Sequence, residues 1–385
     1  MKKINENVNY TGSIEVISLN RDVQTNEVSV TLQTKYLGKT IVKTIPRGNI
    51  TQMGLKEISK YGFPTIVSED NAEFIAYFVD NESDFPVINT YNNVGWHIIN
   101  GKEYFLHRKA ITDGRVKKVE YNGNIDLSCK GKKKDFNIFF DECIKHSIGL
   151  QVVCAVSLAS AVVGRLNDKD MKFIFHIEGS SSSGKTTSLM LAGSLWGNPK
   201  LSPNGVIKNW NITGNKLVHS AGGNNGILIG LDELSMSNAD KTQLTYLLTG
   251  GSDKQRMTDD ENSVPTFNTI FCTTGEIQFK NSNFGGISVR LFEVKNCNLT
   301  KDKEHAETIN DFISNHYGVI GFDFVRALSA ISKEVLYAKL KTLSLKVQKR
   351  IKYHTDKQNK AYSPLFGRNC RQNCRYRIIG KNCKK

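Results

Sequence analysis

The chain has 385 residues, of which 39% are hydrophobic and 23% are charged, and its formal net charge is +15. This composition is typical of a globular protein with two or three domains. The N-terminus lacks the apolar core of a signal peptide, and the only long uncharged run, 146–164, is too polar for a confident membrane span and favours a buried helix. We therefore expect a cytoplasmic protein with no membrane partner.

The positive charge is concentrated at one end of the sequence. Residues 339–385 contain fifteen Lys and Arg and a single acid, Asp356, a local charge of +14, so all other residues together carry +1. The net charge is therefore a property of this tail and does not predict a basic face on the folded body.

Residues 1–125 are predicted to form a small α+β domain. Alternating apolar and polar residues predict strands over about 10–50, with a hairpin turn at 37–39, and helical spacing follows at about 49–61 and 71–79. Strand-like pieces return at about 95–119. Four aromatic residues of this domain suit either base stacking or a core, and we favour the core; they are Tyr91, Trp96, Tyr104 and Phe105.

A basic segment at 126–134 is predicted to be a linker, although a short charge run of this kind could also touch phosphates. After it, Phe136, Phe139 and Cys143 recur three and four residues apart, so 135–165 is predicted to be helical. These helices should pack beside the next strand along the chain, 172–177.

Residues 179–187 match the phosphate-loop pattern G-x-x-x-x-G-K-[ST] at every fixed position. An apolar strand pattern precedes the loop and a helical pattern follows it, so backbone N–H groups and a helix N-terminus should face a phosphate. We expect Lys185 to reach the β and γ phosphates of ATP and Thr186 to bind Mg²⁺. The nucleotide-binding residues are Gly179, Ser180, Ser181, Ser182, Ser183, Gly184, Lys185, Thr186 and Thr187.

A buried apolar strand at 226–231 ends in Asp232 and Glu233, which is the form of a Walker B element. Asp232 is the predicted second Mg²⁺ ligand, and Glu233 is predicted to orient and polarise the attacking water. A strand that ends at a helix N-cap would give a similar sequence, but the phosphate loop at this spacing favours the functional interpretation. The second acid favours hydrolysis over phosphate transfer to a small molecule.

Two further positions complete the predicted catalytic set. A strand at 267–272 closes on Thr273 and Thr274, and a polar residue at that strand end senses the γ-phosphate in ATPases with a strand between the two Walker strands. Thr274 is the first candidate and Thr273 the second. Arg290 lies between a glycine turn and an apolar strand and is the candidate arginine finger for a neighbouring subunit, with Arg256 as its rival.

The whole pattern resembles the family of domain of unknown function 927, the helicase-like AAA+ ATPases of mobile genetic elements, including self-loading replicative helicases of cassette chromosomes. The resemblance covers about 10–330. It rests on the phosphate loop and on seven further stretches, which are Gly95-Trp96, 194–199, 209–213, 231–234, 246–251, 273–276 and 289–291.

The resemblance implies an α/β P-loop NTPase of the AAA+ class, a three-layer sandwich with a parallel central sheet, here at 135–330 and preceded by the α+β domain. It also implies ATP hydrolysis in a homo-hexamer that moves along DNA, with single-stranded DNA as the expected partner, during replication of a mobile element. The alternative is an ATP-binding, non-motor derivative that binds DNA or a partner.

The last segment, 331–385, departs from that family pattern. Its helical periodicity decays after Arg350, and 368–385 has almost no apolar periodicity, three cysteines and no acids. Related helicases continue into further helices and a winged-helix region. We hypothesise that this tail results from a truncation or a frameshift, which the gene sequence would decide.

Overall fold

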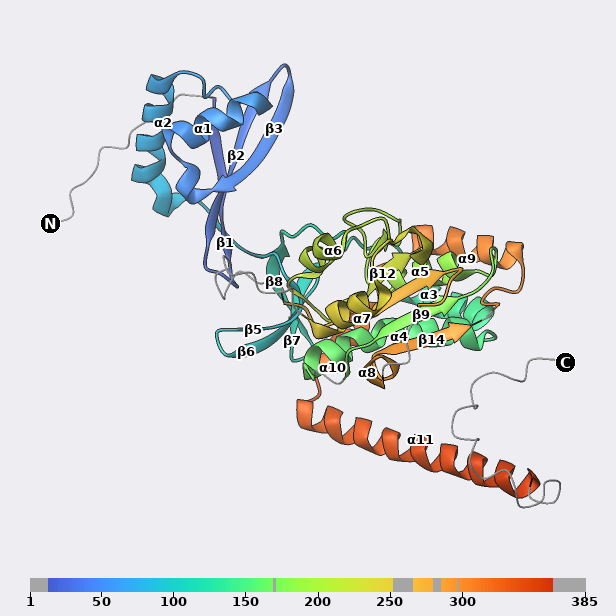
Figure 1. The fold of residues 1–385 in the computed structure, drawn as a ribbon. Coiled ribbons are helices and arrows are strands. Elements are labelled where there is room, and N and C mark those ends of the chain that lie inside the picture. The colour runs from blue at the N-terminus through green and yellow to red at the C-terminus, as the bar shows by residue number, and fades with distance from the viewer. Residues whose placement is uncertain (1–12, 169–170, 252–265, 280–284, 296–297, 363–385) are drawn as a thin grey trace. The chain divides into compact units, whose positions relative to one another are not determined.

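The computed structural model describes residues 13–168, 171–251, 266–279, 285–295 and 298–362 (Figure 1). The chain divides into two compact units, Met1–Ala330 and Ile331–Lys385. In the second unit the described element is the long helix α11 (Lys333–Tyr362). All other helices and strands described below belong to the first unit.

The N-terminal strands form the predicted hairpin. Strand β1 (Glu15–Asp22) pairs with β2 (Val28–Tyr36), and β2 pairs antiparallel with β3 (Lys39–Pro46). The turn at Leu37 and Gly38 has φ angles of 48° and 75°, in the left-handed region that tight hairpin turns require. Helices α1 (Gln52–Ile58) and α2 (Ser68–Asn81) follow and confirm the two helices predicted there.

These strands belong to a nine-stranded mixed sheet. Its order is β11-β5-β6-β7-β8-β4-β1-β2-β3. The remaining strands are β4 (Val87–Tyr91), β5 (Val94–Ile99), β6 (Lys102–Leu106), β7 (Lys109–Thr112), β8 (Arg115–Tyr121) and β11 (Asn224–Asn225). Tyr91, Trp96 and Phe105 are buried, as core residues would be, whereas Tyr104 is only half-buried.

The helical stretch predicted at 135–165 is divided into three pieces. Helix α3 (Lys133–Phe139) runs into a π-helical turn, Phe140–Ile144, and α4 (Ile148–Leu166) begins after Ser147. The break has a local cause, because the Ser147 hydroxyl caps α4 by accepting a hydrogen bond from the Leu150 N–H. By length and composition alone, helix α4 could cross a membrane. Half of its apolar 18-residue window is buried inside the fold, however, and the core helix of a soluble protein can have the same length and composition.

The second sheet has five strands, and every pair of neighbouring strands in it is parallel. Its order is β10-β12-β13-β9-β14, which confirms the predicted parallel sheet and places β13 between the loop-bearing strand and the acidic strand. The strands are β9 (Ile174–Glu178), β10 (Ile207–Asn209), β12 (Ile229–Asp232), β13 (Phe271–Gly275) and β14 (Leu291–Lys295). The helices that accompany this sheet are α5 (Lys185–Ser194), α6 (Gly214–Ala221), α7 (Lys241–Gly250), α8 (Gly285–Ser288) and α9 (Lys303–Asn315). Helix α10 (Ile320–Ser329) packs instead on α4 and on β6 and β7 of the nine-stranded sheet.

Helices cover both faces of the parallel sheet. On one face, Leu217 of α6, Leu244 of α7 and Ile287 of α8 pack in one core with the sheet residues Ile174 and Phe271. On the other face α5 lies against β12 and β13, with α4 and α9 packed on α5 (Figure 1). The carboxyl ends of β9, β12 and β13 therefore meet at one edge of the sheet, where ligands of parallel α/β sheets bind.

Candidate nucleotide site

The phosphate loop connects β9 to α5 with the backbone that its glycines predict. Gly184 has a φ of 81°, and a Cβ built there would lie 2.6 Å from the Thr300 hydroxyl oxygen, so both backbone angle and space require glycine. Ser182 also has a positive φ, 64°. The loop thus turns sharply into the N-terminus of α5, where N–H groups without helical partners can face an anion.

Lys185, the first residue of α5, folds back onto the loop. Its side chain is buried, and its Nζ donates hydrogen bonds to the carbonyl oxygens of Gly179 and Ser180 at 2.7 and 2.6 Å. The Ser183 hydroxyl is also buried and has no hydrogen-bond partner among the described residues. A phosphate would give both groups a stronger acceptor than the neutral carbonyls of the loop.

Three side chains from three elements meet beside the loop. The Thr186 hydroxyl of α5 donates to the Asp232 carboxylate of β12, 3.1 Å from one oxygen and 3.2 Å from the other. The Thr274 hydroxyl of β13 donates to the same carboxylate at 2.5 Å. Asp232 is therefore the shared acceptor of two hydroxyls that lie far apart in the sequence.

Glu233 follows Asp232 with an unusual backbone. Its φ is 63°, rare for a residue with a side chain, and its N–H donates to the Thr274 hydroxyl at 3.2 Å. Its carboxylate accepts a hydrogen bond from the Ser235 hydroxyl at 2.5 Å. The positive φ ends the strand abruptly. The second acid therefore does not continue along the sheet but lines the cavity beside the phosphate loop, which is described below.

The two threonines at the end of β13 point in opposite directions, as strand alternation requires. Thr274 contacts the acid pair, whereas Thr273 shares a 2.6 Å hydrogen bond with His176 of β9. Burial lowers the pKa of His176, and its other ring nitrogen lies 3.0 Å from the Ile277 carbonyl oxygen. The structure therefore places Thr274, and not Thr273, among the site residues.

A cavity of about 610 Å³ opens over the loop and contains Ser181 to Thr187 together with Glu233. Sequence reasoning did not predict the rest of the lining from the segment after β14 into α9, which consists of Asn298, Thr300, Lys301, Asp302, Lys303 and Ala306, and Glu276 also lines the cavity. The start of α9 could have been found, because Asp302 is an N-cap that accepts from the His305 N–H. Its place beside the loop is tertiary and is fixed by the Leu299 N–H, which donates to the Ser183 carbonyl at 3.0 Å.

The donor set fits a magnesium nucleotide. Among the described residues no group of three or more His, Cys, Asp or Glu side chains could hold a metal. Mg²⁺ needs no such cluster, because it is bound through one or two carboxylates, waters and substrate phosphates. Thr186 and Asp232 could supply that set, and three lysines that line the cavity, Lys185, Lys301 and Lys303, could bind the phosphates.

Arg290 lies at the other end of the sheet from the loop. It directly precedes β14, whose Leu291 pairs with Ile174 at the start of β9, so the length of a strand, roughly 15 Å, separates it from the loop. Its guanidinium donates to the Gly286 carbonyl at 3.0 Å and lies 5.6 Å from the Tyr246 ring centroid. The structure thus does not bring Arg290 to the other site residues of its own chain, and its rival, Arg256, lies outside the described residues.

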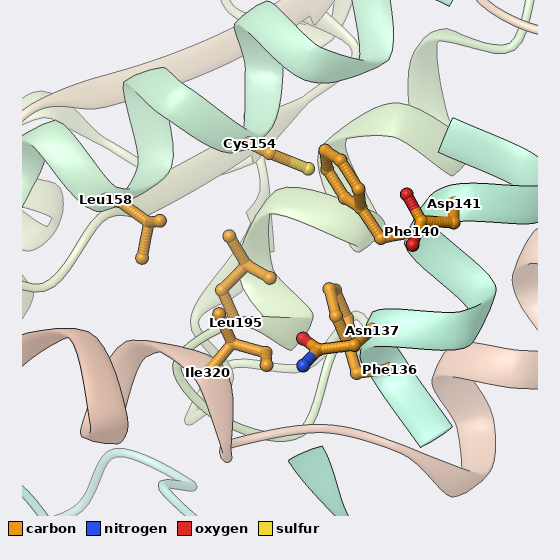
Figure 2. A pocket seen from close by; sticks show the side chains of 8 residues that line it. All are labelled: Phe136, Asn137, Phe140, Asp141, Cys154, Leu158, Leu195 and Ile320. Atoms are coloured by element: carbon orange, nitrogen blue, oxygen red, sulfur yellow. The ribbon is translucent and has the colours of Figure 1, made fainter. Parts of the chain in front are cut away.

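A smaller cavity of about 340 Å³ has different chemistry (Figure 2). Phe136, Phe140, Leu158 and Leu195 give it an apolar lining. Burial raises the pKa of the Cys154 thiol to about 12, so the thiol is not a nucleophile at neutral pH. With Asp141 as its charged group, this cavity lacks the cations that a nucleotide site needs.

Comparisons with known proteins agree with this architecture. The family described as Domain of unknown function (DUF927) matches residues 2–265. A solved structure described as SCCmec type IV Cch, active helicase, has a TM-score of 0.65 and 22% identity, with 80% of this chain and 59% of that chain covered. The chain therefore spans about three fifths of that protein, and the likeness shows a shared fold.

A structure of inhibitor bound to JCV helicase has a TM-score of 0.23 and 11% identity, with 55% of this chain and 67% of that chain covered. This similarity is too low to indicate a shared fold. No curated protein matches the chain.

Proposed function

This chain belongs to the DUF927 family, and we propose that it is an ATP-hydrolysing, helicase-like DNA motor that acts in the replication of a mobile genetic element. The proposal assigns the parallel sheet and its helices to the AAA+ class of P-loop NTPases. One observation carries it: the phosphate loop and the acid pair, 46 residues apart, are joined by hydrogen bonds from Thr186 to Asp232, with Glu233 at the same cavity.

In the proposed reaction, each side chain has one task. Lys185 leaves the loop carbonyls and binds the β and γ phosphates, where its charge offsets the charge that builds up during hydrolysis. Glu233 accepts a hydrogen bond from the attacking water and polarises it. Thr274 holds Asp232 and Glu233 in register and responds to the γ-phosphate. Thr186 and Asp232 would hold Mg²⁺, which supplies further neutralisation of phosphate charge.

The placement of Arg290 limits how it could act. Roughly 15 Å from its own loop, it cannot reach the nucleotide of its own chain, so a role in hydrolysis requires a neighbouring subunit. We propose a homo-hexameric ring of cytoplasmic chains that moves along single-stranded DNA. The family resemblance and the likeness to an active helicase support the ring and the DNA substrate.

The test is steady-state ATP hydrolysis by the purified chain, with and without single-stranded DNA, beside measurement of mass in solution. Lys185→Ala should abolish nucleotide binding. Glu233→Gln should retain binding and lower kcat by roughly 10²- to 10⁴-fold, the usual contribution of a positioned base. Lys200→Ala and Glu57→Gln, at exposed positions outside the cavity, are the matched controls. Hydrolysis that survives Glu233→Gln would refute the assigned role.

The second candidate is an ATP-binding protein that is not a motor. The distance of Arg290 from its own site favours it, because an isolated chain then has Lys185 but no arginine to stabilise the transition state. Nucleotide binding by a monomer with slow hydrolysis that DNA does not stimulate would support this candidate. DNA-stimulated hydrolysis by a large oligomer would exclude it.

A further inference from the structure

We propose that a cup on the nine-stranded sheet, away from the nucleotide site, binds single-stranded DNA. We define the cup by six of the residues that line a cavity of about 510 Å³, which are Arg21, Asn89, Asn100, Tyr104, Lys117 and Lys118. This inference rests on the proposed function, since it names the surface on which a DNA motor would hold its substrate.

The floor of the cup follows from the alternation of side chains along β6. Phe105 faces the protein interior, where it packs against Trp96 and Trp196. Tyr104 and Leu106 face the opposite side and pack in a small cluster with Ala110. Tyr104 is thus the one aromatic residue of the four considered for base stacking that remains half-exposed, and it lies on an apolar floor.

The charge of the cup has one sign. Arg21, Lys117 and Lys118 line it and are exposed, and no carboxylate lines it. Neither lysine forms an ion pair with any described residue. The Arg21 guanidinium donates to the Asn26 side-chain oxygen at 2.7 Å and keeps further N–H groups for other acceptors. A cavity with three cations and no anion favours an anionic ligand.

Amide side chains add hydrogen-bonding groups of both kinds. Asn89 lies beside Arg21, because β1 and β4 pair these two residues in register. Asn100 occupies the β5–β6 turn with a φ of 49°. Both amides are exposed and make no hydrogen bond within the described part of the chain. An amide offers a donor pair and an acceptor, the groups that recognise the edge of a base.

A half-exposed tyrosine on an apolar floor, free side-chain amides and three cations together match a nucleotide, and the volume lies within the range of ligand sites. The arrangement of the cations favours a nucleic-acid strand, which carries several phosphates, over a free nucleotide. Arg115 lies two residues before Lys117 on β8 and is exposed as well, so a further cation lies next to the cavity and can contact another phosphate.

Side chains on the opposite face of β6 connect the cup to the nucleotide site through contacts with α4 and α5. Glu103 of β6 forms an ion pair with Arg165 of α4 at 2.9 Å, and the Ser157 hydroxyl of α4 donates to the Ala192 carbonyl of α5 at 2.7 Å. The helix that begins with Lys185 is therefore two contacts away from the back of the cup.

The first experiment locates the contact directly in the full chain, which also carries a basic tail able to bind DNA by charge alone. A 20-nucleotide oligo(dT) with one 5-iodouracil is bound and irradiated, and adducts are mapped by mass spectrometry. We expect the adduct on the peptide that contains Tyr104. Adducts only within 339–385, or none on β6 and β8, would overturn the proposal.

Fluorescence anisotropy with the same oligonucleotide gives the magnitudes. Tyr104→Ala should weaken binding roughly tenfold, and Tyr104→Phe, which keeps the ring, should bind within about twofold of the unaltered chain. The double variant Lys117→Ala/Lys118→Ala should reduce the slope of log K against log salt by about 0.7 for each lost phosphate contact. Lys35→Ala/Lys39→Ala removes the same charge from exposed positions outside the cup and is the matched control.

The outcomes separate this proposal from the proposed function. Intact ATP hydrolysis with unaltered DNA affinity in the cup variants would refute DNA binding by the cup and leave the proposed function standing. Binding of dTMP that Tyr104→Ala removes, without binding of the oligonucleotide, would replace the strand with a free nucleotide and refute the proposal as stated. Loss of DNA affinity in the cup variants, with unstimulated ATP hydrolysis unchanged, is the expected result.

Discussion

At the scale of single residues, the candidate site depends on Asp232 more than on the loop alone. Its carboxylate accepts from Thr186 and Thr274, which come from α5 and β13. A carboxylate that accepts two hydroxyl hydrogen bonds is held in one orientation, and charged acceptors make stronger hydrogen bonds than neutral ones. The orientation of the carboxylate that would hold Mg²⁺ is therefore set by two hydroxyls.

Removal of the Thr274 hydroxyl tests this arrangement. Thr274→Val keeps the side-chain shape but removes the hydrogen bonds to Asp232 and to the Glu233 N–H. We expect kcat for ATP to fall roughly 10- to 100-fold with little change in nucleotide affinity, since a hydrogen bond to a charged group contributes about 1.5–3 kcal/mol. Steady-state kinetics and binding of a fluorescent ATP analogue measure the two effects, and Thr274→Ser should recover most of the rate.

The neighbouring threonine provides a matched control. Thr273→Val removes the hydrogen bond to His176 on the other side of β13 and leaves Asp232 untouched. It should lower the melting temperature while kcat stays close to that of the unaltered chain. An equal fall in kcat for both valine variants would mean that β13, rather than the Thr274 hydroxyl, is what the substitutions disturb.

His107 gives a pH-dependent contribution to stability. It is fully buried, one ring nitrogen lies 2.6 Å from the Trp196 carbonyl oxygen, and burial lowers its pKa to about 4. Because the unfolded chain has a histidine pKa of about 6.5, it binds more protons than the folded chain between pH 6.5 and 4. Stability is therefore present above pH 6.5 and is lost as the pH falls toward 4.

Urea unfolding at pH 7 and pH 5 measures this contribution. The free energy of unfolding should fall by roughly 2 kcal/mol more for the unaltered chain than for His107→Gln, which cannot titrate. His219→Gln, at an exposed histidine, is the matched control. Identical pH dependence of the unaltered chain and His107→Gln would contradict the assignment.

At the scale of elements, helix α4 closely approaches the backbone at the end of β11. A Cβ built on Gly164 would lie 2.4 Å from the Asn225 carbonyl oxygen and 2.6 Å from the Gly226 Cα, both backbone atoms. The Ser160 hydroxyl donates to the Gly226 carbonyl from one turn earlier. Helix α4 thus holds the chain at the point where it passes from the nine-stranded sheet to the parallel sheet.

Two glycines on the same helix make this packing testable. Alanine normally stabilises a helix by about 1 kcal/mol over glycine, but Gly164→Ala must move backbone atoms and should lower the free energy of unfolding by roughly 1–3 kcal/mol. At Gly149 the nearest atom is the flexible end of Leu299, so Gly149→Ala should be neutral or slightly stabilising. Chemical denaturation of both variants decides it, and equal effects would show that α4 is not packed as described.

At the scale of the whole molecule, the proposed role of Arg290 in hydrolysis requires that chains assemble. Arg290 lies at the amino ends of β9 and β14, whereas the loop lies at the carboxyl end of β9. In a closed ring with head-to-tail contacts, one surface of each subunit meets a different surface of the next. The proposed hexamer would then supply Arg290 to the neighbour's phosphates.

Mixing two inactive variants tests that arrangement. Arg290→Ala and Glu233→Gln should each lower ATP hydrolysis strongly. The first should lower it by at least roughly 10³-fold if Arg290 acts as an arginine finger. In a mixed ring, some interfaces combine an intact Glu233 with an intact Arg290 from the next subunit, so activity should return on mixing. No recovery, in samples shown by mass to have exchanged subunits, would exclude a role for Arg290 across a boundary.

The sequence by itself determined whatever depends on neighbours along the chain. The loop at 179–187, the acid pair after an apolar run, the hairpin at 37–39 and the presence of helices near 52–58 and 68–81 could be predicted directly, because turn geometry and side-chain periodicity act over a few residues. The parallel sheet was implied by the family resemblance that these patterns carry.

Tertiary structure alone decided what depends on contacts between distant segments. It selected Thr274 over Thr273, because only the register of β13 against β12 shows which hydroxyl faces Asp232. It brought Lys301 and Lys303 to the loop, placed Arg290 at the far end of the sheet and left Tyr104 exposed while Phe105 was buried. Packing between distant segments is not encoded in any local pattern, so these positions could be found only from the folded chain.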